Sequence, residues 1–304
     1  MKLATAALLG LVAADDATYI QHLAEFGISY ATREEYEFRK SVFENNVARI
    51  EAHNSDPEAS FEMGLNHMSD WTDAEFEYLL GDISELEPSP EPEDEVINMT
   101  AIDWRKKGGV SPVKNQGHCG SCWSFSATGQ IESSYLVHKK QKVSLSEQQL
   151  VSCANKDGCG GGDKASAMRY TESHPLTTES DYKYDAKSES CNHSKESHGK
   201  YKARDVKHLA SGNNGLYKGL QTQPVSVSVK ADTHWHQYKS GVMKCPASSG
   251  HNHAILAVGW GSDSQGGYWI VKNSWGTGWG EKGYIRLRQD HDCNVTTSLY
   301  IATV

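Results

Sequence analysis

Two cysteines three residues apart raise the first chemical question in this chain. The run Cys119-Gly120-Ser121-Cys122-Trp123 could be half of a zinc site, a redox pair, or two thiols with unrelated tasks. The sequence holds no second C-x-x-C pair, which a four-cysteine zinc site would need. An odd count of cysteines suggests paired bridges plus one free thiol. The seven cysteines lie at positions 119, 122, 153, 159, 191, 245 and 293.

Further motifs stand at set distances from these cysteines. His253 and Asn273 follow Cys122 by roughly 130 and 150 residues, and Asn273 opens a Trp- and Gly-rich run that ends at Gly280. A helical face near the N-terminus recurs at steps of three or four residues: Glu35, Arg39, Phe43, Asn46, Ile50 and Asn54. A shorter motif follows with Gly64, Asn66 and Asp70. Together, in this order, the four motifs resemble the papain-like cysteine proteases of the cathepsin L branch, which carry an inhibitory propeptide.

The resemblance implies a role for each residue of the catalytic motifs. Cys122 would open a helix, whose N-terminus favours a thiolate, and would attack a peptide carbonyl. His253 would protonate the leaving amine, and Asn273 would fix the His253 ring. Gln116 and the Cys122 N–H would stabilise the oxyanion. Trp275 would shield the His253–Asn273 hydrogen bond from water. We therefore expect a cysteine endopeptidase, because no His-His insertion typical of exopeptidase relatives occurs.

The substrate groove is where the chain departs from the family pattern. Gly161 and Gly162 should present a bare backbone edge to an extended substrate. The residues expected at the adjoining pocket are otherwise polar: Asp163, Lys164, His251, Asn252 and Ser298. On one strand, His251 and His253 would point the same way. We expect a polar, pH-sensitive pocket biased toward small, polar or basic side chains, unless these groups turn to solvent.

Six cysteines are left for bridges, and the resemblance implies their pairing. Cys119–Cys159, Cys153–Cys191 and Cys245–Cys293 are the pairs that the family pattern gives, whereas the sequence alone leaves the connectivity open. The histidine pairs 251/253 and 234/236 lack a completing acidic or cysteine ligand. We therefore expect no metal and no other cofactor.

Periodicity predicts the elements that must position these residues. Helices are expected at 18–26, 32–54, 71–80, 124–140 and 146–154, with Thr32 and Glu35 forming a capping box. Strands are expected at 60–65, 225–230, 253–260, 268–272, 284–288 and 298–304. A helical first half and a strand-rich second half predict an α+β domain of two lobes. The resemblance makes these a helical lobe and a β-barrel-like lobe, preceded by a helical propeptide domain.

Charge divides the chain into two modules. Residues 1–97 hold 5 Lys/Arg and 22 Asp/Glu, and residues 98–304 hold 25 and 17, so net charges of −17 and +8 attract each other. We expect a signal peptide at 1–14, an inhibitory propeptide at 15–97, and a peptidase domain at 98–304. The Glu- and Pro-rich stretch 82–97 should be an extended, exposed linker. Acid should favour release of the propeptide, because it protonates carboxylates.

Other features bear on partners and compartment. The basic residues form no stripe with aromatics, which argues against nucleic acid, and no apolar run approaches the ~18 residues of a membrane span. Sequons at Asn98, Asn192 and Asn294 agree with a secretory route to a lysosome, vacuole or the exterior. Expected partners are protein substrates, the chain's own propeptide and cystatin-like inhibitors, with a monomeric enzyme. The alternative is a non-catalytic binding or storage protein on the same fold, which loss of Cys122 would have indicated.

Overall fold

The computed structural model describes residues 16–90 and 100–304. Its helices are α1 (Asp16–Phe26), α2 (Arg33–Asn54), α3 (Asp73–Glu77), α4 (Cys122–Ser134), α5 (Glu147–Gln149), α6 (Lys164–Ser173), α7 (His193–Glu196), α8 (Asn213–Thr222) and α9 (Thr233–His236). The strands are β1 (Phe61–Met63), β2 (Ile102–Asp103), β3 (Asp205–His208), β4 (Val225–Val229), β5 (Tyr238–Met243), β6 (His253–Asp263), β7 (Gly266–Lys272), β8 (Tyr284–Arg288) and β9 (Leu299–Thr303). Within these residues, no helix is both long and apolar enough to cross a bilayer.

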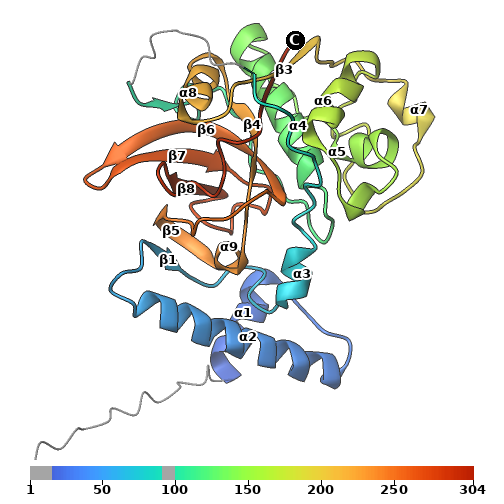
Figure 1. Cartoon of the computed structure of the whole chain (residues 1–304). Coiled ribbons are helices and arrows are strands. Elements are labelled where there is room, and N and C mark those ends of the chain that lie inside the picture. The colour runs from blue at the N-terminus through green and yellow to red at the C-terminus, as the bar shows by residue number, and fades with distance from the viewer. Residues whose placement is uncertain (1–15, 91–99) are drawn as a thin grey trace, which may run out of the picture.

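Two lobes meet along α4 (Figure 1). Every residue of α4 is buried, because the helix packs against α6 on one side and β6 on the other. One hydrophobic core, with Trp123 and Met168, fills the helical lobe, and a second, with Trp269 and Leu287, fills the strand lobe. The prediction of a two-lobed α+β domain is confirmed.

The strand lobe is a mixed sheet that is open at two edges. In the described part of the chain the order is β1-β5-β8-β7-β6-β4-β9-β3, with β2 also on β6. β5 and β8 run parallel, and the other pairs are antiparallel. Val229 on β4 pairs with His253 on β6, which fixes the histidine at the start of a central strand. The sheet is therefore the frame that holds one side of the cleft.

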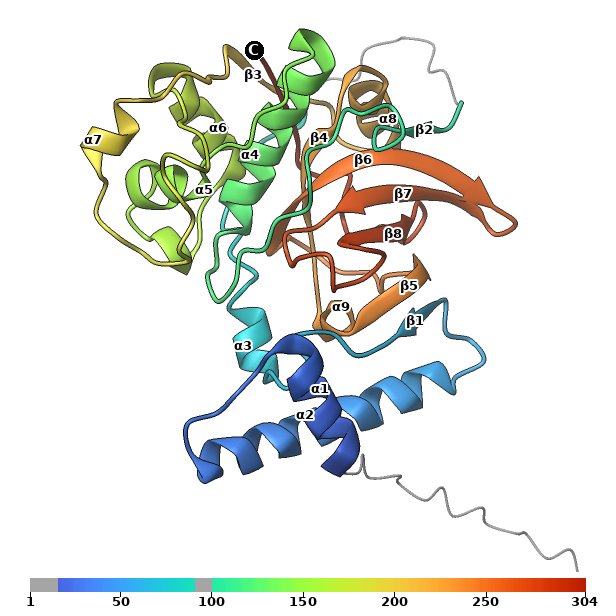
Figure 2. The ribbon, with the colours of Figure 1, turned by 180° about the vertical axis from the view of Figure 1, so that it is seen from behind.

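The N-terminal module docks on one end of this sheet. α1 and α2 lie beyond α9 and β5 (Figures 1 and 2), and β1 extends the sheet by pairing antiparallel with β5. After α3 the chain runs up past α4, where Ile83 N donates to Gly162 O at 3.2 Å. The module thus reaches from the sheet edge into the region between the lobes.

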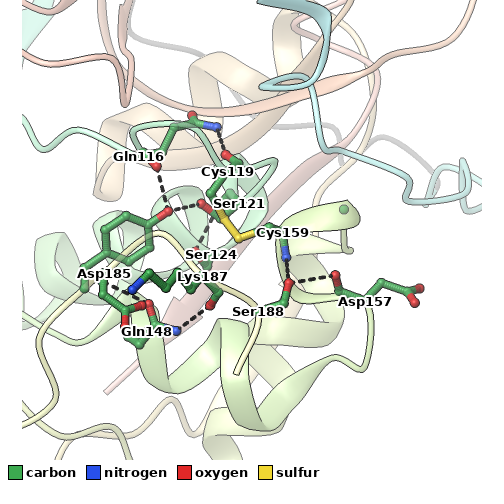
Figure 3. Close-up of a disulfide and its surroundings, with 12 residues drawn as sticks. Gln116, Cys119, Ser121, Ser124, Gln148, Asp157, Cys159, Asp185, Lys187 and Ser188 are labelled. Atoms are coloured by element: carbon green, nitrogen blue, oxygen red, sulfur yellow. Dashed lines mark hydrogen bonds between the residues drawn. A yellow bond between two sulfur atoms is a disulfide. The ribbon is translucent and has the colours of Figure 1, made fainter. Parts of the chain in front are cut away.

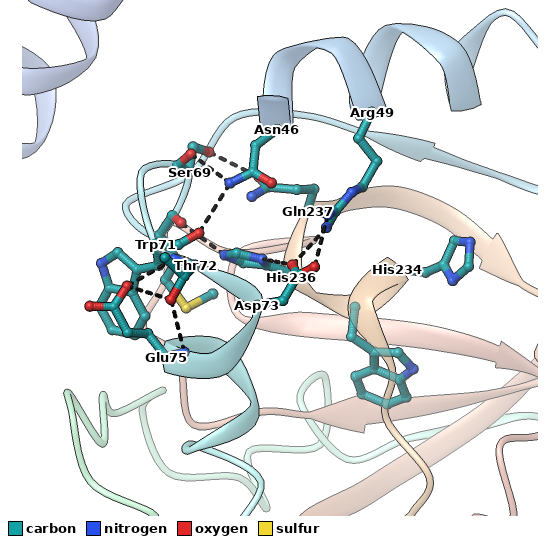
Figure 4. A network of polar contacts seen from close by, with 12 residues as sticks. Asn46, Arg49, Ser69, Trp71, Thr72, Asp73, Glu75, His234, His236 and Gln237 are labelled. Atoms are coloured by element: carbon teal, nitrogen blue, oxygen red, sulfur yellow. Dashed lines mark hydrogen bonds and ion pairs between the residues drawn. The ribbon is translucent and has the colours of Figure 1, made fainter. Parts of the chain in front are cut away.

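Polar side chains of the helical motif hold the N-terminal module together. Arg39 makes two hydrogen bonds to Glu75 at 2.6 and 2.7 Å and a third to Glu35 at 2.7 Å. Asn46 donates to Ser69 O and Trp71 O (Figure 4). This face of α2 mixes polar with apolar residues because the polar side chains bind groups of the segment that follows the helix.

The remaining motif residues divide between packing and polar contacts. Phe43 and Ile50 are buried, and Phe43 packs against Tyr19 and His22 of α1, whereas Asn54 exchanges two hydrogen bonds with the Met63 backbone at 2.9 Å. Asp70 accepts a hydrogen bond from Tyr30 at 2.6 Å, and Asn66 donates to His236 O at 2.9 Å. Gly64 leaves room for Lys239, whose side chain would lie 2.5 Å from an added Cβ.

Several local predictions differ from the structure, and the helix predicted at 71–80 is the short α3, Asp73–Glu77. Thr32 caps α2 by accepting from Glu35 N, but the Glu35 carboxylate binds Arg39, so the reciprocal capping box is absent there. A complete capping box instead starts α3 at Thr72 and Glu75. The helices predicted at 124–140 and 146–154 both end in a π-helical turn, at Tyr135–Lys139 and Leu150–Ala154.

The predicted linker at 82–97 also needs correction. Residues 85–90 are exposed, as expected for a Glu- and Pro-rich stretch. Asp82, however, is 4% exposed and bridges to Gly162. Residues 91–97 lie outside the described part of the chain.

Candidate active site

Cys122 is the one free cysteine among the described residues, and it begins α4. Its side chain is buried, and its Sγ accepts a hydrogen bond from Ala254 N at 3.5 Å. Because Ala254 directly follows His253 on β6, the thiol of one lobe lies beside the histidine strand of the other. The packing of α4 on β6 thus brings together Cys122 and the strand of His253, which are about 130 residues apart in the sequence.

The His253 ring is held by two groups of the following segment. Nε2 of His253 lies 2.8 Å from Oδ1 of Asn273, and the Trp275 indole stacks on the ring with centroids 4.7 Å apart. Trp275 is 1% exposed, so the His253–Asn273 hydrogen bond is covered from solvent. Nδ1 of His253 has no hydrogen-bond partner among the described residues.

Gln116 presents its amide to the N-terminal module. Its Nε2 donates to Leu79 O at 3.0 Å and to Cys119 O at 2.8 Å, while its Oε1 accepts from Ser274 and Trp275. The Cys119–Cys159 disulfide lies next to this glutamine and ties the loop before α4 to the loop before α6 (Figure 3). A carbonyl of the N-terminal module, Leu79 O, therefore accepts the Gln116 hydrogen bond that the resemblance predicts for an oxyanion.

The cleft is closed, and this sets the charges of the pair. Burial, with a smaller contribution from the Asp82 carboxylate, raises the pKa of the Cys122 thiol to about 12. Burial lowers the pKa of His253 to about 4, against the Asn273 hydrogen bond, which raises it. Both groups are thus neutral at pH 7 while the propeptide covers them.

The predicted pocket residues separate into three roles. Gly162 must lack a side chain, because an added Cβ would lie 2.5 Å from the Trp123 ring. Asp163 does not supply the pocket's charge: it caps α6 by accepting from Ala165 N and Ser166 N. Lys164 supplies the basic group of the pocket, and its Nζ lies 2.6 Å from Ser228 Oγ and 2.8 Å from Ser298 Oγ.

Two further pocket residues precede β6 and are not part of that strand. His251 nevertheless faces the pocket, with Nε2 2.9 Å from Ser84 Oγ and 3.9 Å from Asp82 Oδ2. Asn252 turns its amide to Ala231 and offers only its carbonyl, which accepts from Asp82 N at 3.0 Å. Gly161, at φ +126°, adopts a backbone conformation that favours glycine.

The disulfides and sequons can also be placed. The three bridges are Cys119–Cys159, Cys153–Cys191 and Cys245–Cys293. Asn192 is exposed and caps α7 through its oxygen, which leaves its amide nitrogen accessible. The Asn294 nitrogen, in contrast, donates to Ser248 O and Gly250 O, so a glycan there would break two hydrogen bonds. Asn98 lies outside the described residues.

Sequence reasoning missed three residues of this region. Asp82 and Ser228 line the charged pocket together with Lys164, and His236 forms the contact between α9 and the N-terminal module. A lysine next to the glycine edge was visible in the sequence. Its partners were not, since they lie on β4 and in the N-terminal module.

Comparison with known proteins agrees with this arrangement. The papain family cysteine protease model matches residues 99–303, and the cathepsin propeptide inhibitor domain matches residues 19–76. The chain is 36% identical to digestive cysteine proteinase 1 of Homarus americanus over 333 residues, covering 100% of both chains. Similar solved structures are a recombinant stem bromelain precursor (TM-score 0.88, 34% identity) and digestive procathepsin L 3 of the Tenebrio molitor larval midgut (TM-score 0.86, 32% identity). Each covers 95% of this chain and is itself covered to 98%. The chain therefore belongs to the papain family of cysteine proteases and is a cysteine endopeptidase zymogen with a propeptide that inhibits it from within the same chain.

Proposed function

We propose that Cys122 is the nucleophile of this endopeptidase and that His253 is its acid and base. Cys122 attacks the peptide carbonyl and forms an acyl-enzyme, and His253 delivers a proton to the leaving amine. Asn273 keeps the ring of His253 in its orientation. Gln116 and the Cys122 N–H donate hydrogen bonds to the oxyanion, a contribution worth ~2.7–4 kcal/mol per donor.

One observation carries this assignment. The amide of Gln116, six residues before the free thiol of Cys122, donates to a propeptide carbonyl, Leu79 O, at 3.0 Å. The donor that an oxyanion would need is thus engaged by a carbonyl in the inhibited precursor. The non-catalytic alternative would require an absent or bridged thiol at position 122, and the Cys122 thiol is free.

The proposal extends to processing and to the compartment. The signal peptide would end at residue 14 and the propeptide at residue 97, giving a mature peptidase of residues 98–304. A secretory route to a lysosome, vacuole or the exterior fits the sequons and the disulfides. The mature enzyme would act as a monomer and would accept cystatin-like inhibitors in its cleft.

The test compares the precursor with Cys122→Ser at pH 4.5. Wild-type precursor should lose its propeptide, hydrolyse casein and react with an epoxide inactivator at position 122. Cys122→Ser should stay full-length and unlabelled, yet be cut when wild-type enzyme is added, which shows that the variant is folded and its cleavage site accessible. Self-processing of Cys122→Ser at the wild-type rate would refute the assignment.

A further inference from the structure

The propeptide places one carboxylate in the pocket beside the nucleophile. Asp82 is held there by its backbone, with its N–H on Asn252 O at 3.0 Å and the next residue, Ile83, on Gly162 O. Its side chain is fully covered. Oδ2 accepts from Ser228, and Oδ1 accepts from Ser84 at 2.6 Å. The pocket therefore encloses an acidic side chain, although the sequence predicted small, polar or basic ones.

The peptidase side of this pocket carries a buried lysine. Lys164 is 0% exposed, and its Nζ donates to Ser228 at 2.6 Å and to Ser298 at 2.8 Å. Ser228 in turn donates to Asp82, so one hydroxyl links the ammonium to the carboxylate. The Lys164 Nζ lies over the Tyr300 ring, 5.1 Å from the ring centroid. His251, with its side chain 4% exposed, completes the wall 3.9 Å from Asp82.

Among residues 16–90 and 100–304 no carboxylate lies within ion-pair distance of Lys164, and Asp82 reaches it through the Ser228 hydroxyl. The neighbouring Asp163 is engaged in capping α6, through bonds to Ala165 N and Ser166 N at 2.9 and 3.1 Å. Burial lowers the pKa of Lys164, and the propeptide carboxylate of Asp82 is the largest influence that raises it. That carboxylate leaves with the propeptide, so an acidic side chain that enters the pocket would again favour the charged ammonium.

We propose that the mature enzyme selects substrates with an acidic side chain at the second residue before the scissile bond, and that Lys164, through Ser228 and Ser298, is the specificity-determining group. The inference rests on the proposed function, because it assigns the pocket next to Gly162 to that substrate residue. The buried segment around Asp82 then acts as a substrate-like occupant. A leucine side chain in the same place would leave Lys164 and three polar neighbours facing an apolar group.

The test uses mature enzyme from acid processing and three fluorogenic dipeptides that carry Arg before the dye and Asp, Asn or Leu before Arg. We expect kcat/KM for the Asp peptide to exceed those for the Asn and Leu peptides by about tenfold to a hundredfold, the value of a hydrogen bond to a charged group. Equal rates for Asp and Asn, or a faster Leu peptide, would overturn the proposal. This comparison of the three peptides uses the wild-type enzyme alone.

A substitution then identifies the cation. Lys164→Gln should reduce the Asp-to-Leu ratio to about one, while Lys139→Gln, a change at an exposed lysine far from the cleft, should leave it unchanged. A Lys164→Gln enzyme that keeps the wild-type ratio would exclude Lys164 as the determinant. If the variant does not fold, the wild-type ratio decides.

The two proposals fail in different ways. An enzyme that reacts with the epoxide at Cys122 and cleaves the Leu peptide at least as fast as the Asp peptide contradicts only the acidic preference. An enzyme that cleaves none of the three peptides and is not labelled contradicts the assignment of Cys122, and the preference with it.

Discussion

His236 places a titrating group on the surface where propeptide and peptidase meet. Its Nε2 donates to Met68 O at 2.8 Å, and its ring stacks on Phe76 with centroids 4.7 Å apart. Burial lowers the pKa of His236 to about 4, although the Met68 bond and the Asp73 carboxylate, 4.0 Å from Nδ1, raise it. Docking therefore requires the neutral imidazole.

The sign and size of the effect follow from linkage. A histidine with a depressed docked-state pKa supports docking fully above its ordinary pKa of about 6.5, and that support is lost as the pH falls toward about 4. If release restores the ordinary value, protonation of His236 favours release by about 2 kcal/mol at pH 5, which is roughly thirtyfold in the docking equilibrium. The pKa values of Glu62 and Glu87 are lowered, by Lys239 and Arg169 respectively. Their support for docking is therefore lost only as the pH falls below their ordinary pKa of 4.5.

The assay is processing of the full-length precursor over a pH series. His236→Gln keeps a donor for Met68 O but cannot take a proton, so its half-processing pH should fall and its rate at pH 5 should drop by up to about thirtyfold. His138→Gln, at an exposed histidine, is the matched control and should process like wild type. A His236→Gln precursor with the wild-type pH profile would refute the reasoning.

Two other substitutions test the site and the propeptide. Asn273→Ala removes the 2.8 Å partner of His253, so kcat should fall about tenfold with little change in KM; steady-state kinetics on the mature enzyme measures this, and a change in KM alone would argue against an orienting role. Arg39→Met leaves Glu35 and Glu75 without their cation, which should destabilise the docked propeptide by ~2 kcal/mol. Thermal unfolding of an inactive Cys122→Ser precursor should show an earlier propeptide transition, and an unchanged profile would contradict the prediction.

The sequence predicts which segments build the candidate active site because their motifs are local and specific. The helix start at Cys122, the strand start at His253 and the Trp-rich turn at Asn273 each constrain a backbone conformation, and the structure brings these three segments together. The strands β4, β6, β7, β8 and β9 were predictable for a similar reason, since alternating or continuous apolar runs between glycines and polar turns mark buried strands. β5, which contains Lys239, Ser240 and Gly241, was not predicted.

Pairings across the fold could not be predicted from composition. Residue 82 begins a Glu- and Pro-rich stretch that predicts exposure, and nothing in the local pattern indicates that Asp82 alone enters a pocket. The choice between Asp163 and Lys164 depends on where α6 begins, because the residue before the first turn caps it and the next one faces inward. If α6 began one residue earlier, Asp163 would face the pocket in place of Lys164, and the pocket would carry the opposite charge.

These pairings also explain how the propeptide segment around Asp82 keeps the zymogen inactive. Asp82 satisfies Lys164 through Ser228, and the same carboxylate adds to burial in raising the pKa of Cys122. The propeptide therefore blocks the cleft and also withholds the charge that makes sulfur a nucleophile. Its departure removes the covering chain and the negative charge together, so the thiol can ionise beside His253 only when the pocket has been vacated. Occupancy of the substrate pocket and protonation of the nucleophile are thus coupled, mainly through burial by the propeptide chain and to a smaller extent through Asp82.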